Sequence, residues 1–246
     1  MAKHPKSNYY SHGYEFKKSI KTNANKHTNK YLVINLDLKD FFSKITTIEI
    51  ANLLISIFKI NKEDAIFLAL LTTYKNKLPQ GATSSPILSN FYLYEMDFEI
   101  KNFLYNGIYY SRYADDLTFS TNKKNININA FVRKINSIIQ NHNMSLNYDK
   151  INVYHKNKSQ RVTGLIVNEK INLDRSFLKK IRAILHNISK NGLEEEKDKF
   201  EKEYCQKELL TTLEGWINYV GFIRGYDDTL YLDFKTQYSK IYNDNY

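Results

Sequence analysis

Three aspartates have the residue type and the setting for phosphate chemistry that uses two metal ions. Asp37 ends an otherwise apolar stretch, and Asp115 and Asp116 are adjacent inside an alternating segment. Crowded carboxylates repel one another unless cations compensate them, and carboxylate oxygens are ligands that Mg²⁺ prefers. Carboxylates from two neighbouring strands can hold two Mg²⁺ about 3.5–4 Å apart, the arrangement for in-line attack at a phosphate. Because Asp is also common in turns, the Asp115-Asp116 pair alone leaves an ordinary turn open as well.

The elements that must position these aspartates follow from the hydrophobic periodicity. Residues 31–37 predict a buried strand, and residues 108–119 predict a β-hairpin with the acidic pair at its tip. A loop at 78–81 precedes a Ser cap and Pro86, which start a helix that continues to about residue 98. Further strands are predicted over 151–154 and 161–167, and helices over 48–58, 62–73, 127–142, 177–188, 194–208 and 209–222. This mixture, with antiparallel hairpin signals, predicts the α+β class.

Composition excludes several other classes of protein. The 246 residues are 42% hydrophobic and 14% aromatic, which is enough apolar material for a core and excludes wholesale disorder. The single cysteine, Cys205, excludes a disulfide framework and a multi-cysteine zinc site, and we expect it to be inert. No apolar run approaches the roughly 20 residues that span a bilayer, and no signal peptide is evident. The sequence therefore predicts a cytoplasmic protein with no membrane partner.

The net charge of +10 is distributed unevenly along the chain. Residues 1–30 hold seven lysines against one acid, residues 121–192 have a net charge of +11, and residues 193–246 have a net charge of −5. Basic segments of this kind suit a polyanion such as nucleic acid. An AT-rich coding bias produces Lys-rich chains too, so charge alone leaves nucleic-acid binding open.

Three sequence boxes resemble the catalytic motifs of reverse transcriptases. Tyr113-Ala114-Asp115-Asp116 resembles their YxDD box, INLDLKDFF (34–42) their first catalytic motif, and LPQGATSSPILSN (78–90) their LPQG…SP motif. Two further elements are similar to those of bacterial retron reverse transcriptases: NANKH (23–27) to NAxxH, and Val162-Thr163-Gly164 to VTG. The resemblance runs from about residue 12 to residue 225.

The resemblance implies a right-hand polymerase fold, in which an antiparallel palm sheet has helices packed on one face. Residues 1–30 would be a remnant of the fingers or a basic arm, residues 31–168 the palm with fingers helices inserted at about 46–77, and residues 169–246 a helical thumb. Such enzymes usually carry tens of residues before the NAxxH element, so we expect a shortened fingers region. A partial gene product, a split enzyme and a compact variant all remain open.

The resemblance also assigns roles to single residues. The catalytic, metal-binding triad would be Asp37, Asp115 and Asp116, which would hold two Mg²⁺, or Mn²⁺ in their place, with Asp115 as a principal ligand and Asp116 as a weaker or second-metal ligand. The residues that would contact the incoming nucleotide are Leu38, Phe42, Gln80, Gly81 and Lys150. Phe42 would be the gate that rejects a ribose 2′-OH, although Phe41 and Phe42 could both be core residues. Lys150 falls near the lysine that protonates the leaving pyrophosphate, or is simply solvated.

A second set of residues would contact primer, template or RNA. The residues implied for primer and template are Tyr113, Arg175, Lys179, Lys180 and Arg182. The last four lie on a basic amphipathic segment that would reach duplex phosphates, unless it is only a solvated helix face. Asn23 and His27 could touch RNA or could be hydrogen-bonding residues that brace the palm.

The function that the resemblance implies is RNA-directed DNA polymerisation of the retron type. The enzyme would copy part of a structured non-coding RNA from deoxynucleoside triphosphates, hold the RNA–DNA product, and act with an effector protein in anti-phage defence. Two alternatives remain open. One is a non-catalytic RNA-binding or complex-forming module, and the other is a reverse transcriptase like those of group II introns or abortive-infection systems.

Overall fold

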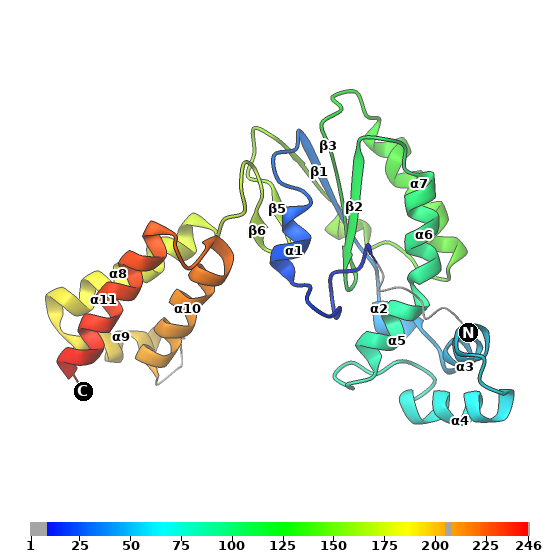
Figure 1. Cartoon of the computed structure of the whole chain (residues 1–246), viewed down its shortest axis with the longest axis horizontal. Coiled ribbons are helices and arrows are strands. Elements are labelled where there is room, and N and C mark those ends of the chain that lie inside the picture. Colours follow the sequence, from blue (N-terminus) through cyan, green and yellow to red (C-terminus); the bar gives the residue numbers. More distant parts are fainter. Residues whose placement is uncertain (1–8, 205–207, 246) are drawn as a thin grey trace. The chain divides into compact units, whose positions relative to one another are not determined.

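The computed structural model describes residues 9–204 and 208–245, which form two compact units (Figure 1). Unit 1 runs to Thr163 and includes Val167–Lys170, and unit 2 comprises Gly164–Ile166 and the chain from Ile171 onward. Within the described ranges, no helix is long and apolar enough to cross a membrane.

Unit 1 is built on a four-stranded antiparallel sheet with the order β2-β3-β1-β4. The strands are β1 (Leu32–Asp37), β2 (Ile108–Tyr113), β3 (Asp116–Thr121) and β4 (Asn152–His155). The predicted strand at 31–37, the hairpin at 108–119 and the strand at 151–154 are confirmed. The two strands that carry the aspartates, β1 and β3, are therefore central neighbours.

The two faces of this sheet differ in chemistry because successive side chains alternate between them. Figure 1 shows α6 (Tyr94–Phe103) and α7 (Ile128–Asn141) along one side of the sheet. The apolar face turned to them carries the buried side chains of Ile34, Leu36, Tyr110, Leu117 and Phe119. The opposite face, which we call the polar face, carries Asp37, Ser111, Tyr113, Asp116, Thr118 and Ser120. The predicted α+β class is thus confirmed, with α6 and α7 packed on the apolar face, while the short helix α1 (Ile20–Asn25) contacts the polar face.

The remaining helices of unit 1 precede α6 along the chain. They are α1 (Ile20–Asn25), α2 (Phe41–Lys44), α3 (Thr47–Phe58), α4 (Lys62–Thr72) and α5 (Ser85–Tyr92). The predicted helices at 48–58, 62–73 and 127–142 are confirmed. The prediction of one helix from residue 84 to about residue 98 is wrong, because the chain leaves helical geometry at Leu93 and restarts as α6. Leu93 is fully buried and has φ of −84° and ψ of 0°, and the two helices meet at this residue.

The prediction of a single strand over residues 161–167 is also wrong. The chain forms the short strands β5 (Arg161–Val162) and β6 (Leu165–Ile166), separated by a turn at Thr163 and Gly164. Both turn residues have positive φ, 46° and 81°, as a type I′ turn requires at its two central positions. Gly164 indicates this turn in the sequence, but the apolar residues on both sides of it favour a continuous strand.

Unit 2 is helical. Its helices are α8 (Arg175–Asn191), α9 (Leu193–Tyr204), α10 (Leu209–Arg224) and α11 (Thr229–Asn245), and α8 packs against α9 and α11. The predicted helices at 177–188 and 209–222 are confirmed. The helix predicted at 194–208 is observed as far as Tyr204, and Cys205 lies outside the described residues. Helix α11 was not predicted, although Phe234, Tyr238 and Ile241 are buried at helical spacing.

Candidate active site

The register of the central strands brings the three aspartates to one end of the polar face. Asp37 is the last residue of β1 and lies directly opposite Asp116, the first residue of β3. Asp115 precedes Asp116 in the turn, and its carbonyl oxygen accepts a hydrogen bond from the Leu38 amide at 3.0 Å. The sequence prediction that two neighbouring strands would supply these carboxylates therefore agrees with the sheet.

The turn that carries the acidic pair has only two residues, Ala114 and Asp115, between β2 and β3. Ala114 has φ of 55°, the left-handed conformation, which costs a non-glycine residue roughly 1–2 kcal/mol. Two-residue hairpin turns of the primed types require this positive φ at their first central residue. The acidic pair is therefore presented by a tight turn whose backbone is slightly strained at Ala114.

The electrostatics of this end favour a bound cation. Asp37 is buried, whereas Asp115 is half-buried and Asp116 is exposed. Partial loss of hydration and repulsion from Asp115 and Asp37 raise the pKa of Asp116 to about 6. Burial, together with repulsion from Asp37, raises the pKa of Asp115 as well. Lys150 forms its ion pair with Asp37, with its Nζ 3.1 Å from Oδ1 and 3.2 Å from Oδ2, and its charge partly offsets the rise in the pKa of Asp115 and Asp116.

Three carboxylates supply the oxygen ligands that a hard divalent cation prefers, and the Lys150 ammonium supplies part of the positive charge that such a cation would bring. Asp37 raises the pKa of both Asp115 and Asp116, and a divalent cation bound among the three carboxylates would relieve this repulsion. In the described part of the chain, no three or more His, Cys, Asp or Glu side chains are already gathered as a metal-ion site. The Lys150 ammonium instead lies against Asp37, where it supplies a single positive charge.

The residues implied for nucleotide contact lie in three places. Leu38 is buried, and its amide is already bonded to Asp115. Phe42 is half-buried in α2, with its ring centroid 4.7 Å from that of the buried Phe41, so the two phenylalanines are not equivalent core residues. Gln80 and Gly81 are exposed in the loop before α5, where Gly81 has φ of 91°.

Tyr113 and the basic helix are placed as follows. Tyr113 is half-buried on the polar face, directly opposite Asp116 on the side away from β1. Arg175, Lys179 and Arg182 are exposed on α8 at spacings of four and three residues, so they share one helix face. Lys180 is half-buried on another face, with its Nζ 4.0 Å from the centroid of the Trp216 ring.

Asn23 and His27 lie inside the fold, where their side chains form hydrogen bonds with the sheet, as expected for the second of the two roles that the sequence left open. Both are fully buried, so a direct contact with RNA does not fit this structure. His27 Nδ1 is 2.7 Å from Ser120 Oγ, and its Nε2 is 2.7 Å from Ser111 Oγ. Ser111 in turn donates a hydrogen bond to Asn23 Oδ1 at 2.6 Å. This network ties the segment around α1 to the polar face of the sheet.

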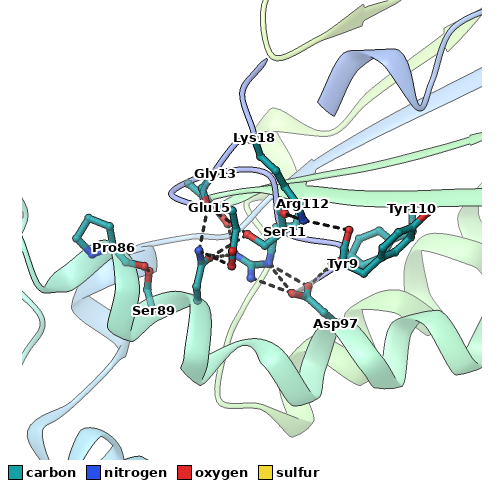
Figure 2. A network of polar contacts seen from close by, with 12 residues as sticks. Tyr9, Ser11, Gly13, Glu15, Lys18, Pro86, Ser89, Asp97, Tyr110 and Arg112 are labelled. Carbon is teal, nitrogen blue, oxygen red and sulfur yellow. Dashed lines mark hydrogen bonds and ion pairs between the residues drawn. The ribbon is translucent and has the colours of Figure 1, made fainter. Parts of the chain in front are cut away.

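Sequence analysis missed the buried ion pair beneath the acidic turn. Arg112 of β2 and Asp97 of α6 have no exposed surface and lie 2.8 Å apart through Nη2 and Oδ2 (Figure 2). A signal for Arg112 was present, because it follows Ile108 and Tyr110 at the period of two that marks the core side of a strand. A charge at such a position requires a buried partner. Asp97 carried no comparable signal.

With the geometry in hand, comparison with known proteins identifies the family. Residues 1–167 match the family described as reverse transcriptase (RNA-dependent DNA polymerase). The chain therefore belongs to the reverse transcriptase family.

The curated relatives are retron reverse transcriptases, which confirms the resemblance seen in the motifs. The Retron Ec86 enzyme of Escherichia coli is 35% identical over 189 residues, 74% of this chain and 57% of that protein. The Retron Ec73 enzyme of Escherichia coli is 35% identical over 200 residues, 73% of this chain and 62% of that protein. The Retron Mx65 enzyme of Myxococcus xanthus is 32% identical over 201 residues, 74% of this chain and 46% of that protein. The chain thus spans about half the length of the curated relatives it matches.

Solved structures support the fold. Apo telomerase from Candida tropicalis aligns with a TM-score of 0.51 at 14% identity, over 90% of this chain and 45% of that chain. Telomerase of the same organism in complex with a TWJ fragment of telomeric RNA aligns with a TM-score of 0.51 at 13% identity, over 92% of this chain and 41% of that chain. At these identities the likeness concerns the α+β fold alone.

Proposed function

We propose that the chain is an RNA-directed DNA polymerase of the retron type, with Asp37, Asp115 and Asp116 as its catalytic triad. The observation that supports this most is the direct pairing of Asp37 with Asp116 on adjacent strands, next to Asp115 in a two-residue turn. Its substrates would be deoxynucleoside triphosphates and part of a structured non-coding RNA, and its product an RNA–DNA duplex. It would act in the cytoplasm, in anti-phage defence beside an effector protein.

In this proposal, the triad, Lys150 and Tyr113 each have a separate role in nucleotidyl transfer. Mg²⁺, or Mn²⁺ in its place, would be held by Asp37, Asp115 and Asp116, and when bound supplies a lowered pKa for the attacking 3′-hydroxyl and charge compensation at the phosphate. Lys150 Nζ lies 3.1 Å from Asp37 Oδ1 and would donate a proton to the leaving pyrophosphate. Tyr113, beside Asp116, would pack against the primer end.

The other contacts follow from position and exposure. Phe42 presents a partly exposed ring five residues after Asp37, as a gate against a ribose 2′-OH requires. Gln80 and Gly81 would touch the incoming nucleotide from an exposed loop. In this proposal, residues 31–168 are the palm with fingers helices at about 46–77, and residues 169–246 are the thumb. Duplex phosphates would be contacted by Arg175, Lys179 and Arg182 on one face of α8, and by Lys180, whose ammonium lies 4.0 Å from the centroid of the Trp216 ring.

Polymerase activity is tested with the full chain on poly(rA)·oligo(dT), dTTP and Mg²⁺. We expect wild-type protein to extend the primer and the Asp115→Ala/Asp116→Ala double variant to give no product above background. A melting curve for each protein establishes that both are folded. Equal extension by the two proteins would reject the catalytic assignment.

A non-catalytic RNA-binding module is the second candidate, and the Lys150–Asp37 ion pair is the observation that favours it. In a module of this kind the lysine would stand permanently in place of the cation. Such a chain would bind poly(rA)·oligo(dT) with an affinity that falls steeply with salt, yet would extend no primer at any Mg²⁺ or Mn²⁺ concentration. Extension that is lost in Asp37→Asn would exclude this candidate.

A further inference from the structure

A buried ion pair lies directly beneath the turn that carries Asp115 and Asp116. We infer that Arg112, held by Asp97 and Asn90, is a positioning residue that sets the backbone at Ala114 and so aims the two carboxylates that follow. Its activity and Mn²⁺-binding readouts rest on the proposed polymerase function, whereas hydrogen–deuterium exchange at the turn does not.

Arg112 is held in one orientation by a bidentate contact. Its Nε lies 2.9 Å from Asp97 Oδ1, and its Nη2 lies 2.8 Å from Asp97 Oδ2. The Tyr110 hydroxyl donates a third hydrogen bond to Asp97 Oδ1 at 2.6 Å. All three side chains are buried within the apolar side of the sheet. Apolar residues of similar volume often replace a buried ion pair without loss of stability, so a contribution to stability alone is a weak reason for this pair.

The remaining guanidinium nitrogen reaches the acidic turn. Arg112 Nη1 donates to the Ala114 carbonyl oxygen at 3.0 Å and to Asn90 Oδ1 at 3.2 Å. The Ala114 carbonyl belongs to the peptide that joins Ala114 to Asp115, so this bond fixes the peptide plane just before the acidic pair. Ala114 is the residue in the left-handed conformation. Only a planar guanidinium with five donors can serve the carboxylate and this carbonyl at once.

A strap formed by Tyr10–Gly13 holds the turn from the other side. The Arg112 amide donates to the Tyr10 carbonyl at 2.8 Å, and the His12 amide donates to the Arg112 carbonyl at 2.7 Å. A Cβ atom at Gly13 would lie 2.5 Å from the Ala114 backbone nitrogen, which is closer than real atoms approach. Glycine at this position therefore permits the contact between strap and turn.

Asn90 of α5 joins the strap to the arginine. Its Nδ2 donates to the Gly13 carbonyl at 2.9 Å, while its Oδ1 accepts from Arg112 and from the Ser11 hydroxyl. Figure 2 shows Gly13, Ser11, Arg112 and Asp97 converging from three segments of the chain. The turn is thus held between the Arg112 side chain, which bonds the Ala114 carbonyl, and the backbone of the strap at Gly13. A shift of either changes where Asp115 and Asp116 point before it changes the sheet.

The first test is Gly13→Ala, with Gly215→Ala as the matched control. A Cβ at Gly215 meets no atom within 4 Å, and that glycine has no positive φ. We expect Gly13→Ala to speed hydrogen–deuterium exchange in peptides covering residues 113–117 and to weaken Mn²⁺ binding measured by electron paramagnetic resonance. We expect kcat for dTTP incorporation to fall about a hundredfold, as misplacement by about 1 Å can cause. Gly215→Ala should match wild type in all three.

The second test separates positioning from ion pairing. Arg112→Lys keeps a positive charge opposite Asp97 but cannot bond the carboxylate in bidentate fashion and the Ala114 carbonyl together. We expect a folded protein with faster exchange at residues 113–117, lower kcat and a nearly unchanged KM for dTTP. A purely structural ion pair would be rescued by lysine.

The outcomes divide clearly. Wild-type exchange and Mn²⁺ binding in Gly13→Ala, or full kcat in Arg112→Lys, would overturn the inference. If Arg112→Lys does not fold, Gly13→Ala decides alone. If wild-type protein incorporates no dTTP, the proposed function fails, while hydrogen–deuterium exchange at residues 113–117 still decides whether the clamp positions the turn.

Discussion

The two ends of the polar face of the sheet differ in how well their polar side chains are paired. At one end, Asp37 and Asp116 face each other, and Lys150 forms an ion pair with Asp37. At the other end, His27 lies fully buried between Ser111 and Ser120, with a hydrogen-bond partner at each ring nitrogen. Burial and nearby lysines lower the pKa of His27 to about 3, so the ring is neutral and well matched to its surroundings.

This difference separates stability from reactivity along a single pair of strands. A neutral, buried and fully bonded histidine stabilises the fold, because its polar atoms exchange water for protein partners. Crowded carboxylates do the reverse, since they repel one another and lose hydration. The histidine end therefore supports the sheet, and the acidic end retains the unbalanced charge that a cation and a phosphate could use.

The largest expected effect is loss of activity at the acidic end without loss of stability. We expect Asp115→Asn to lower dTTP incorporation by about 1000-fold, because it removes a charged ligand and a charge that acts at the transferred phosphate. Removing one of three repelling carboxylates should leave the free energy of unfolding equal or higher by up to about 1 kcal/mol. Primer extension and urea unfolding at pH 7.5 measure the two quantities. Normal primer extension by a folded Asp115→Asn protein would contradict the assignment of activity to the acidic end.

The reverse pattern is expected at the histidine end. His27→Ala should lower the free energy of unfolding by about 3 kcal/mol, because it leaves a cavity and deprives two buried serines of a partner. The protein that remains folded at low temperature should keep the wild-type KM for dTTP. His155→Ala is the matched control, since His155 is exposed. Urea unfolding with no difference between the two variants would contradict the bracing role.

Acid should destabilise the protein through its two buried histidines, His27 at the histidine end and His12 in the strap beside the acidic turn. The pKa values of His12 and His27 are lowered to about 3 from 6.5, chiefly by burial, so the unfolded chain binds more protons between these values. Their contribution to stability is therefore complete above pH 6.5 and declines as the pH falls towards 3, by about 1.4 kcal/mol per pH unit for each histidine. Urea unfolding at pH 7.5, 6.5 and 5.5 measures this decline. His27→Gln should reduce the slope of this decline by at least half, because protonation of Asp116, whose pKa is raised to about 6, stabilises the folded protein over the same pH range. An unchanged slope would show that His27 is not the group responsible.

The smallest effect on stability is expected at Lys150. Its side chain is 61% exposed, so Lys150→Met should leave the free energy of unfolding nearly unchanged. Activity should nevertheless fall about 10–100-fold, and the alkaline limb of its pH profile should shift, if the ammonium donates a proton. Lys156→Met, at another exposed lysine, is the control. Equal activity in the two variants would confine Lys150 to charge compensation.

Much of the acidic end was predictable because its information is local. An apolar run that stops at Asp37, and an alternating segment with an acidic pair at its centre, predict two strands and a turn from neighbouring residues alone. The same local logic located the basic face of α8. It failed over residues 161–167, where a turn needing positive φ at Thr163 and Gly164 interrupts an apolar run, and at α11, whose buried residues are diluted by polar ones.

Sequence by itself determined the residue types at the acidic turn, the strands that carry them and the family to which the chain belongs. Only the tertiary structure decided that Asp37 faces Asp116, that His27 joins Ser111 to Ser120, and that Arg112 reaches Asp97 and the Ala114 carbonyl. The physical reason is separation along the chain. His27 and Ser120 are 93 positions apart and Asp97 and Arg112 are 15 apart, so packing of the whole sheet selects these partners.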